Sequence, residues 1–241
     1  MTDNYFGRRL ANRYELMDPI GQGSMGKVYL AKDTLLGGVP VAVKFLAQTL
    51  LNEQMTQRFM HEAMTCAQLG NYSMHVVRVT DYGVTEEEVP FYVMEYLKGK
   101  NLGQVIQSHP IPVKRFLDFT RQICLGLAKA HEGIILDGRV VPIIHRDIKP
   151  SNIVVRSHDQ QLVLIDLGAI RYIDPRRSVN PNIQRGTEAY SVIGTPGYQA
   201  PEQAEGKPSQ ASDYYAVGCT LIHLLTGTHP ADLPSSDSGE I

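Results

Sequence analysis

The sequence has few cysteines and no long apolar run. Its 241 residues include three cysteines, Cys66, Cys124 and Cys219, which form no C-x-x-C pair. An odd number of widely spaced cysteines argues against a disulfide framework or a structural zinc site and favours a reducing compartment. No stretch approaches the ~18 apolar residues of a membrane span, and the polar start lacks the apolar segment of a signal peptide. We therefore expect a cytoplasmic location and no membrane segment within this chain, and leave open an anchor beyond residue 241.

The sequence also lacks an excess of charge of either sign. Its 23 Lys and Arg residues and 25 Asp and Glu residues give a formal net charge of −2. Proteins that bind nucleic acids or anionic membranes normally carry a basic excess, so we expect no nucleic-acid partner. Hydrophobic residues make up 43% of the chain, which is enough for one large domain or two lobes.

Secondary-structure patterns change near residues 97–101. The first part is rich in strand patterns that are separated by glycine turns, and it contains one helical pattern at 52–69. Asn52 is the expected N-cap of that helix, and Gly70 is its expected end. The second part is mainly helical, with a long apolar stripe that starts at residue 113.

A glycine-rich segment, Gly21-Gln-Gly23-Ser-Met-Gly26, has the spacing G-x-G-x-x-G. On its own this spacing is weak, and an ordinary turn is the alternative interpretation. A dinucleotide-binding domain needs a helix directly after the motif, whereas the next residues, KVYLAKD, favour a strand. We therefore expect a hairpin whose backbone N–H groups close over phosphates, because glycine permits an approach that a Cβ atom would block. No Walker-type phosphate loop is present.

Lys44 lies inside an apolar strand pattern, VAVKFL. A surface lysine is the alternative interpretation. Glu62, however, shares a helical face with Phe59 and Cys66, so its carboxylate points toward the apolar stripe. Because a buried carboxylate is rarely unpaired, the pattern favours Lys44 as the partner of Glu62.

The most informative segment is His145-Arg-Asp147-Ile-Lys149-Pro-Ser-Asn152. Asp147 and Asn152 lie on one loop between apolar runs, where they can place a proton-accepting carboxylate and a metal-binding amide around a phosphate. Asp166-Leu-Gly168 follows at the end of a strand pattern. Carboxylate and amide oxygens suit Mg²⁺, which binds through few protein groups together with phosphates. Each motif alone is common, but this order and spacing is not.

Together these segments resemble the catalytic domain of the Hanks-type (eukaryotic-like) protein kinases, in their bacterial Ser/Thr branch. The resemblance runs from about residue 14 to 230. It implies an α+β, bilobal protein-kinase fold with an N-terminal arm at 1–12, an N-lobe at 13–97 with an antiparallel sheet plus an αC-like helix, and a mainly helical C-lobe at 98–241. It also implies a non-specific serine/threonine protein kinase that uses ATP and Mg²⁺, with Mn²⁺ as an alternative.

The resemblance assigns roles to individual residues. Asp147 matches the catalytic base, Lys149 the lysine that contacts the γ-phosphate, and Asn152 and Asp166 the metal ligands. A lysine two residues after the catalytic aspartate, here Lys149, is typical of kinases that act on Ser and Thr. The resemblance therefore implies protein substrates that bear these hydroxyls.

The nucleotide-binding residues follow from the same resemblance. Lys44 matches the lysine that binds the α- and β-phosphates while paired with Glu62 of the αC-like helix. Met94 matches the gatekeeper, and the backbone of Glu95 and Leu97 is expected to bind adenine. The complete expected set is Gly21, Gln22, Gly23, Ser24, Gly26, Val28, Ala42, Lys44, Met94, Glu95 and Leu97.

Three further residues are expected to be structural. Thr195, in the segment GTPGYQAPE, matches the residue that hydrogen-bonds the catalytic aspartate and lysine. Asp213 is expected to brace the catalytic loop. Glu202 matches a carboxylate that pairs, in the family, with an arginine of a later helix. Because the sequence stops before that region, we expect a C-lobe without its final helices, in which Glu202 contacts solvent or a nearby Arg or Lys such as Lys207.

Regulation can also be inferred from the resemblance. Arg146 precedes the catalytic aspartate, which in this family marks kinases that are switched by phosphorylation of the activation segment. We expect autophosphorylation there, through self-association in trans, with Thr187 as the first candidate acceptor and Ser191 and Ser178 as weaker ones. The alternative is that these hydroxyls are merely solvated.

The sequence departs from the family pattern at several places. Leu167 replaces a phenylalanine, Tyr215 stands where a tryptophan is common, and residues 135–142 form an apparent insertion without an assigned role. Two other functions are weighed against the kinase. The filled catalytic positions disfavour a pseudokinase scaffold, and the peptide-platform segment disfavours a small-molecule kinase.

Overall fold

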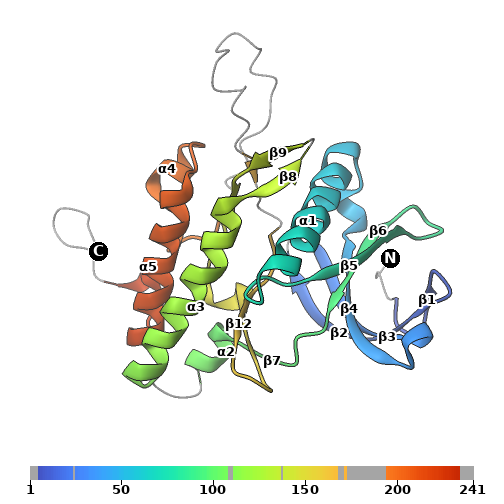
Figure 1. Cartoon of the computed structure of the whole chain (residues 1–241), viewed down its shortest axis with the longest axis horizontal. Helices are drawn as coiled ribbons and strands as arrows, with labels where there is room; N and C mark the ends of the chain where they lie inside the picture. Colours follow the sequence, from blue (N-terminus) through green and yellow to red (C-terminus); the bar gives the residue numbers. More distant parts are fainter. Residues whose placement is uncertain are drawn as a thin grey trace, which may run out of the picture. The chain divides into compact units, whose positions relative to one another are not determined.

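The computed structural model describes residues 5–23, 25–107, 111–136, 138–167, 171–172 and 194–233. The chain forms two compact units (Figure 1). The first comprises residues 1–72 and 76–98, and the second comprises residues 73–75 and 99–241. The change of unit after Lys98 falls within the region where the sequence patterns change.

The first unit is a six-stranded antiparallel sheet with one long helix packed against it (Figure 1). The strand order is β1-β2-β3-β4-β6-β5. The helix α1 starts as predicted, because the Asn52 side chain accepts a hydrogen bond from the backbone N–H of Met55 at 2.9 Å. The elements are β1 (Arg9–Leu10), β2 (Tyr14–Gly23), β3 (Gly26–Asp33), β4 (Val39–Leu46), α1 (Glu53–Tyr72), β5 (Val79–Val84), β6 (Pro90–Glu95) and the 3₁₀ turns Thr34–Leu36 and Gln48–Leu50.

Helix α1 continues through Gly70 to Tyr72, so the predicted end at Gly70 is wrong. Gly70 instead lies where the helix meets the chain that leads into β5. A Cβ atom at Gly70 would lie 2.6 Å from the Cα atom of Arg78 and 2.9 Å from the carbonyl oxygen of Val77. The glycine therefore serves a close approach between two backbones rather than the termination of the helix.

The two faces of the sheet have different coverings. Side chains alternate along a strand, so Lys44 and Tyr92 lie on the face that α1 covers, where the Tyr92 and Phe59 ring centroids are 4.9 Å apart. On the opposite face Phe45 stacks on Tyr5, with 4.2 Å between the ring centroids. Tyr5 is only 4% exposed. Leu10 is also buried and pairs with Tyr14 of β2, so the side chains of Tyr5 and Leu10 pack on the sheet while most other described residues of the N-terminal arm are exposed.

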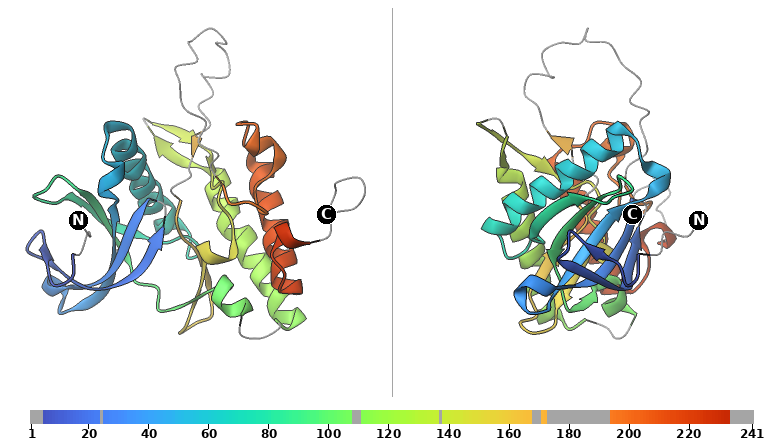
Figure 2. Two further views of the ribbon diagram at one scale, coloured as in Figure 1. Left: turned by 180° about the vertical axis from the view of Figure 1, so that it is seen from behind. Right: turned by 90° about the vertical axis from the view of Figure 1, so that its right-hand side faces the viewer.

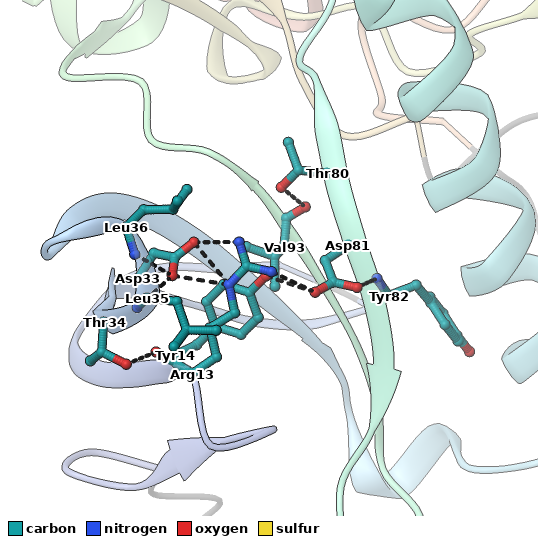
Figure 3. Close-up of polar contacts among 10 residues, drawn as sticks. All are labelled: Arg13, Tyr14, Asp33, Thr34, Leu35, Leu36, Thr80, Asp81, Tyr82 and Val93. Carbon is teal, nitrogen blue, oxygen red and sulfur yellow. Dashed lines mark hydrogen bonds and ion pairs between the residues drawn. The ribbon is translucent and has the colours of Figure 1, made fainter.

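Arg13 links the start of β2 to two other parts of the sheet (Figure 3). Its Nε donates to both carboxylate oxygens of Asp33, at 2.9 and 3.0 Å, and its Nη2 donates to Oδ2 at 2.7 Å. The Tyr14 hydroxyl donates to Asp81 at 2.7 Å. The guanidinium holds the pKa of Asp33 below its ordinary value, and burial together with Asp81 raises the pKa of Tyr14.

The second unit is mainly helical, and α3 and α5 lie side by side in it (Figure 2). Apolar residues of both helices, including Ile123, Leu127 and Leu224, form its core with residues of the three-stranded sheet β12-β11-β7. Among the described residues, no helix is long and apolar enough to cross a membrane. The elements are β7 (Gly99–Asn101), α2 (Leu102–Ile106), α3 (Val113–Glu132), β8 (Ile134–Leu136), β9 (Arg139–Val141), β10 (Ile143–Ile144), β11 (Ile153–Arg156), β12 (Leu162–Leu164), β13 (Arg171–Tyr172), α4 (Pro201–Ala204), α5 (Gln210–Thr226) and the 3₁₀ turns Pro150–Asn152 and Pro230–Asp232.

The apparent insertion at 135–142 forms most of a two-stranded hairpin, β8–β9. Ile134 pairs with Val141, and Ile135 pairs with Val140. Ile134 is buried, whereas Ile135 and Val140 are exposed. The described residues of the insertion therefore pair with one another within the second unit.

Candidate active site

The glycine-rich segment is the connection of the β2–β3 hairpin. Gly21 pairs with Val28, and Gly23 pairs with Gly26. The motif therefore joins two strands and does not begin a helix. A dinucleotide-binding domain requires a helix at that position, so this class is excluded. Gly21, Gln22 and Gly23 are exposed and Val28 is half-buried, so the tip of the hairpin is accessible to a ligand.

Glycine is required at Gly26 for a different physical reason than at Gly23. Gly26 has a φ of 151°, and a Cβ atom there would lie 1.9 Å from the carbonyl oxygen of Phe45. Only glycine lets the hairpin lie this close to β4, next to Lys44. At Gly23, a Cβ atom would meet no described atom within 4 Å. That position leaves open space of the kind a phosphate needs to approach backbone N–H groups.

Lys44 forms a buried ion pair with Glu62. The Nζ–Oε1 distance is 2.8 Å, and the residues are 6% and 1% exposed. Tyr92, which pairs with Lys44 across β4 and β6, donates its hydroxyl hydrogen bond to the same Glu62 oxygen at 2.8 Å. Because a buried charge is costly unless it is paired and hydrogen-bonded, these contacts fix the ammonium position within the sheet.

The expected adenine-binding segment begins at the end of β6. Met94 is half-buried and pairs with Ala42 of β4, which is buried. The backbone N–H of Glu95 donates to the Arg78 carbonyl oxygen at 3.0 Å. That N–H is therefore already engaged, and any contact of Glu95 with adenine falls to its carbonyl group. Leu97 is half-buried and follows in the connection to the second unit.

Asp147 lies at the centre of a hydrogen-bond network in the second unit. Its Oδ1 accepts a hydrogen bond from the Thr195 hydroxyl at 2.8 Å. Its Oδ2 accepts one from the Asn152 side chain at 3.0 Å and lies 2.9 Å from the Lys149 ammonium. Lys149 also donates to the Thr195 hydroxyl at 2.7 Å. The carboxylate is thus oriented from both sides, and its remaining lone pairs can accept a further proton.

Asn152 and Asp166 suit a divalent cation. The Asn152 amide donates both to Oδ2 of Asp147 and to the Asp147 carbonyl oxygen at 2.9 Å, so its own oxygen is the group left for a ligand. Asp166 has a φ of 61°, a left-handed conformation that is uncommon outside glycine and clusters at functional sites. Both residues offer the hard oxygen donors that Mg²⁺ prefers. The described part of the chain contains no cluster of three or more His, Cys, Asp or Glu side chains for a metal.

Asp213 of α5 holds the backbone that precedes Asp147. It is fully buried, and its carboxylate accepts hydrogen bonds from the N–H groups of His145 at 3.0 Å and Arg146 at 2.8 Å. The His131 ring lies 2.8 Å from the same carboxylate. Arg146 has a φ of 67°, so these two bonds stabilise a strained turn.

The side chain of Glu202 in α4 is half-buried, and its contact is with α5 rather than with Lys207. Its carboxylate accepts a 2.6 Å hydrogen bond from the Ser212 hydroxyl at the start of α5. Lys207 instead donates to Glu205 at 3.2 Å on the exposed surface. Glu202 therefore joins α4 to α5.

Several expected residues lie outside the described part of the chain. They are Ser24 of the glycine-rich segment, Gly168 and the three candidate phosphorylation sites Thr187, Ser191 and Ser178. The structure therefore bears on none of them.

Sequence reasoning missed three contributors to this geometry. Tyr92 has no motif, and only the strand register reveals that it lies beside Lys44. His131 falls within the apolar stripe that starts at residue 113, and its ring contacts Asp213. Gln203, next to Glu202, donates a 2.7 Å hydrogen bond to the carbonyl oxygen of Arg146. A polar residue on an otherwise buried helix face was the available signal for His131.

The first unit thus holds a glycine hairpin and a buried Lys–Glu pair, and the second unit holds an Asp–Lys–Asn–Thr network. The family model of the protein kinase domain matches residues 14–240. The chain therefore belongs to the protein kinase domain family, and the predicted fold class is confirmed.

The chain is also similar to curated bacterial proteins. It is 46% identical over 241 residues to serine/threonine-protein kinase A of Synechocystis sp. (strain ATCC 27184 / PCC 6803 / Kazusa), covering 98% of this chain and 45% of that protein. It is 36% identical over 245 residues to serine/threonine-protein kinase B of the same organism, covering 97% and 40%. With serine/threonine-protein kinase PrkC of Bacillus subtilis (strain 168), the identity is 34% over 235 residues, covering 96% and 33%. The chain thus spans less than half the length of these relatives.

Proposed function

We propose that this chain is the catalytic domain of a serine/threonine protein kinase, which transfers the γ-phosphoryl group of ATP to Ser and Thr hydroxyls of proteins. The observation that carries the proposal is the network around Asp147, in which Lys149 and Thr195 contact the same carboxylate. The names of the curated relatives support the same class.

Asp147 is the proposed catalytic base. Its carboxylate accepts the proton of the attacking hydroxyl, while its bonds to Asn152 and Thr195 keep it in one orientation. The Lys149 ammonium, 2.9 Å from Asp147, stabilises negative charge that develops on the transferred group. Most of the catalytic effect then comes from positioning and charge stabilisation rather than from covalent chemistry.

The first unit is proposed to bind the nucleotide. Lys44, held by Glu62, binds the α- and β-phosphates, and the exposed tip of the β2–β3 hairpin offers backbone N–H groups to them. Asn152 and Asp166 are the proposed ligands of Mg²⁺, with Mn²⁺ as an alternative. When bound, the metal neutralises phosphate charge.

Regulation and location follow as further parts of the proposal. We expect autophosphorylation of the activation segment, with Thr187 before Ser191 and Ser178, and self-association for transfer in trans. Arg146 is the cation that a phosphate would meet. A cytoplasmic location is proposed from the sequence alone.

Transfer from γ-labelled ATP tests the proposal. The full chain is incubated with a generic protein substrate, with matched Ser, Thr and Tyr peptides and with a panel of small-molecule alcohols, each with and without Mg²⁺ or Mn²⁺. We expect metal-dependent labelling of the protein and of the Ser and Thr peptides. Labelling of small molecules alone would support a small-molecule kinase, and nucleotide binding without any transfer would support a pseudokinase.

A further inference from the structure

The rings of Tyr198, His223 and His229 form a cluster at the segment that carries Thr195. The Tyr198 hydroxyl is 2.5 Å from Nδ1 of His223 on α5. The ring centroids of Tyr198 and His229 are 5.2 Å apart, and those of His223 and His229 are 5.6 Å apart. Tyr198 is 5% exposed and His223 is half-buried, so this hydrogen bond is partly shielded from water.

The cluster is tied to Thr195 by a tight turn. The N–H of Tyr198 donates to the carbonyl oxygen of Thr195 at 3.0 Å. Gly197 in this turn has a φ of 84°, and a Cβ atom there would lie 2.9 Å from Cε1 of His229. Only glycine lets the turn pack against that ring. The position of Tyr198 therefore affects the hydroxyl of Thr195, which contacts both Asp147 and Lys149.

Donation from the Tyr198 hydroxyl to His223 requires a neutral imidazole with no proton on Nδ1. Burial raises the pKa of Tyr198 to about 12, so the phenol keeps its proton near neutral pH and donates it. Nδ1 can accept that hydrogen bond only while it carries no proton. Protonation of His223 would turn Nδ1 into a donor and leave the buried phenol O–H without this acceptor. Burial and the nearby His229 lower the pKa of His223, which favours the neutral, accepting form.

Other titratable groups surround the pair. His229 precedes the Pro230–Asp232 turn, and its Nδ1 accepts a hydrogen bond from the N–H of Ala231 at 3.2 Å. Asp232 is in that turn. On α5, Cys219 and Tyr215 lie one and two turns before His223, and burial raises the pKa of both. Glu202 of α4 acts electrostatically on Tyr215, and α3 contributes His131, which contacts Asp213.

We propose that His223 is a positioning residue for phosphoryl transfer, which acts through Tyr198 and Thr195 on the Asp147–Lys149 pair and does so only while its imidazole is neutral. This inference rests on the proposed kinase function and extends it. It gives the domain an acid-sensitive step that belongs to neither the catalytic base nor the nucleotide site.

Steady-state kinetics of the full chain between about pH 5.5 and 8 test the inference. His223→Asn places an amide oxygen near the position of Nδ1 and does not titrate, His223→Leu removes the acceptor, and Tyr198→Phe removes the donor. His158→Asn, a change at an exposed histidine, is the matched control. Thermal melting of each variant shows whether it is folded.

At pH 8 we expect His223→Asn to keep near wild-type kcat. His223→Leu and Tyr198→Phe should lower kcat roughly fivefold, the scale of one hydrogen bond, with the KM for ATP unchanged. As the pH falls through the pKa of His223, which lies below the ordinary histidine value of about 6.5, the wild type and the His158→Asn control should lose activity that His223→Asn retains.

Two results would overturn the inference. One is an unchanged kcat in a folded Tyr198→Phe variant, and the other is an identical acid limb in the wild type and His223→Asn. If the wild type transfers no phosphoryl group at all, the proposed kinase function fails first. In that case an NMR titration of the His223 ring decides the contact, which is overturned if its pKa is the same in the wild type and Tyr198→Phe.

Discussion

Lys44 lies in the middle of a strand, whereas Asp147 lies on a loop, and the two side chains are held in different ways. The position of Lys44 is set by the pairing of β4 with β3 and β6 and by one ion pair with Glu62. Asp147 is held by side chains that come from distant parts of the second unit, including Thr195. Backbone pairing in the sheet therefore positions Lys44, whereas a network of side-chain hydrogen bonds positions Asp147.

This difference predicts how the sheet around Lys44 and the network around Asp147 should respond to mutation. In the sheet, loss of one partner leaves the backbone of β4 in place, so the damage concentrates on the remaining buried charge. In the network, Asp213, Thr195 and Asn152 each restrain the same loop, so the loss of one loosens the others. We therefore expect changes in stability and activity to be separable for Lys44 and coupled for Asp213.

The largest effect should come from Asp213→Ala. This change leaves the N–H groups of His145 and Arg146 without their acceptor inside the second unit, and we expect it to cost about 3–5 kcal/mol of unfolding free energy. Activity should fall with it, because the turn before Asp147 is no longer held. Denaturant unfolding and transfer assays measure the two losses.

Asp213→Asn is the matched control for that change. It keeps the shape and one acceptor oxygen, so its losses should lie between those of the wild type and Asp213→Ala. A fully stable and active Asp213→Ala variant would show that the buried carboxylate does not hold the loop.

Lys44→Met should reduce kcat/KM about 10²-fold, since one charged phosphate contact is lost. It should also destabilise the first unit, because Glu62 stays buried without the Lys44 ammonium, while the neutral Tyr92 hydroxyl still donates to it. The double variant Lys44→Met/Glu62→Gln should recover stability but not activity. Recovery of both would mean that the pair is structural and that Lys44 does not bind the nucleotide.

Thr195→Val should have a smaller effect. Valine matches the shape of threonine but cannot bridge Asp147 and Lys149, so we expect kcat to fall about fivefold to tenfold with the KM for ATP unchanged. Thr195→Ser keeps the hydroxyl and should stay close to wild type. Equal kcat values for the valine and serine variants would remove Thr195 from the network.

The smallest effect concerns the Arg13–Asp33 pair. The folded-state pKa of Asp33 is depressed by Arg13, so the pair contributes stability above the unfolded pKa of about 3.9 and loses it as pH falls through the lower, folded pKa. The melting temperature of the wild type should exceed that of Asp33→Asn at pH 6, and the gap should narrow below about pH 4. A gap that stays constant down to pH 3 would contradict this.

The sequence predicted the parts of the site that follow from regular structure. Residue types after Gly26 ruled out a helix there, and helical spacing placed Glu62 on the face where it meets Lys44. The N-cap at Asn52 was equally readable, because capping is local.

The sequence could not give contacts that depend on the tertiary fold. Tyr92 reaches Glu62 only through strand register, and Gly70 reads as a helix stop because the approach of Arg78 leaves no local trace. The stacking of Tyr5 on Phe45 was not predicted for the same reason, because Tyr5 lies in a mainly polar segment with no local signal of burial.

The central claim is that Asp147 acts in the chemical step and not in nucleotide binding. The most direct measurement is single-turnover transfer and Mg·ATP affinity for Asp147→Asn beside Asp166→Asn in the full chain. We expect Asp147→Asn to lose transfer by about 10²- to 10⁴-fold with nearly unchanged affinity, and Asp166→Asn to weaken Mg·ATP binding itself. Wild-type turnover in the Asp147→Asn variant would contradict the account.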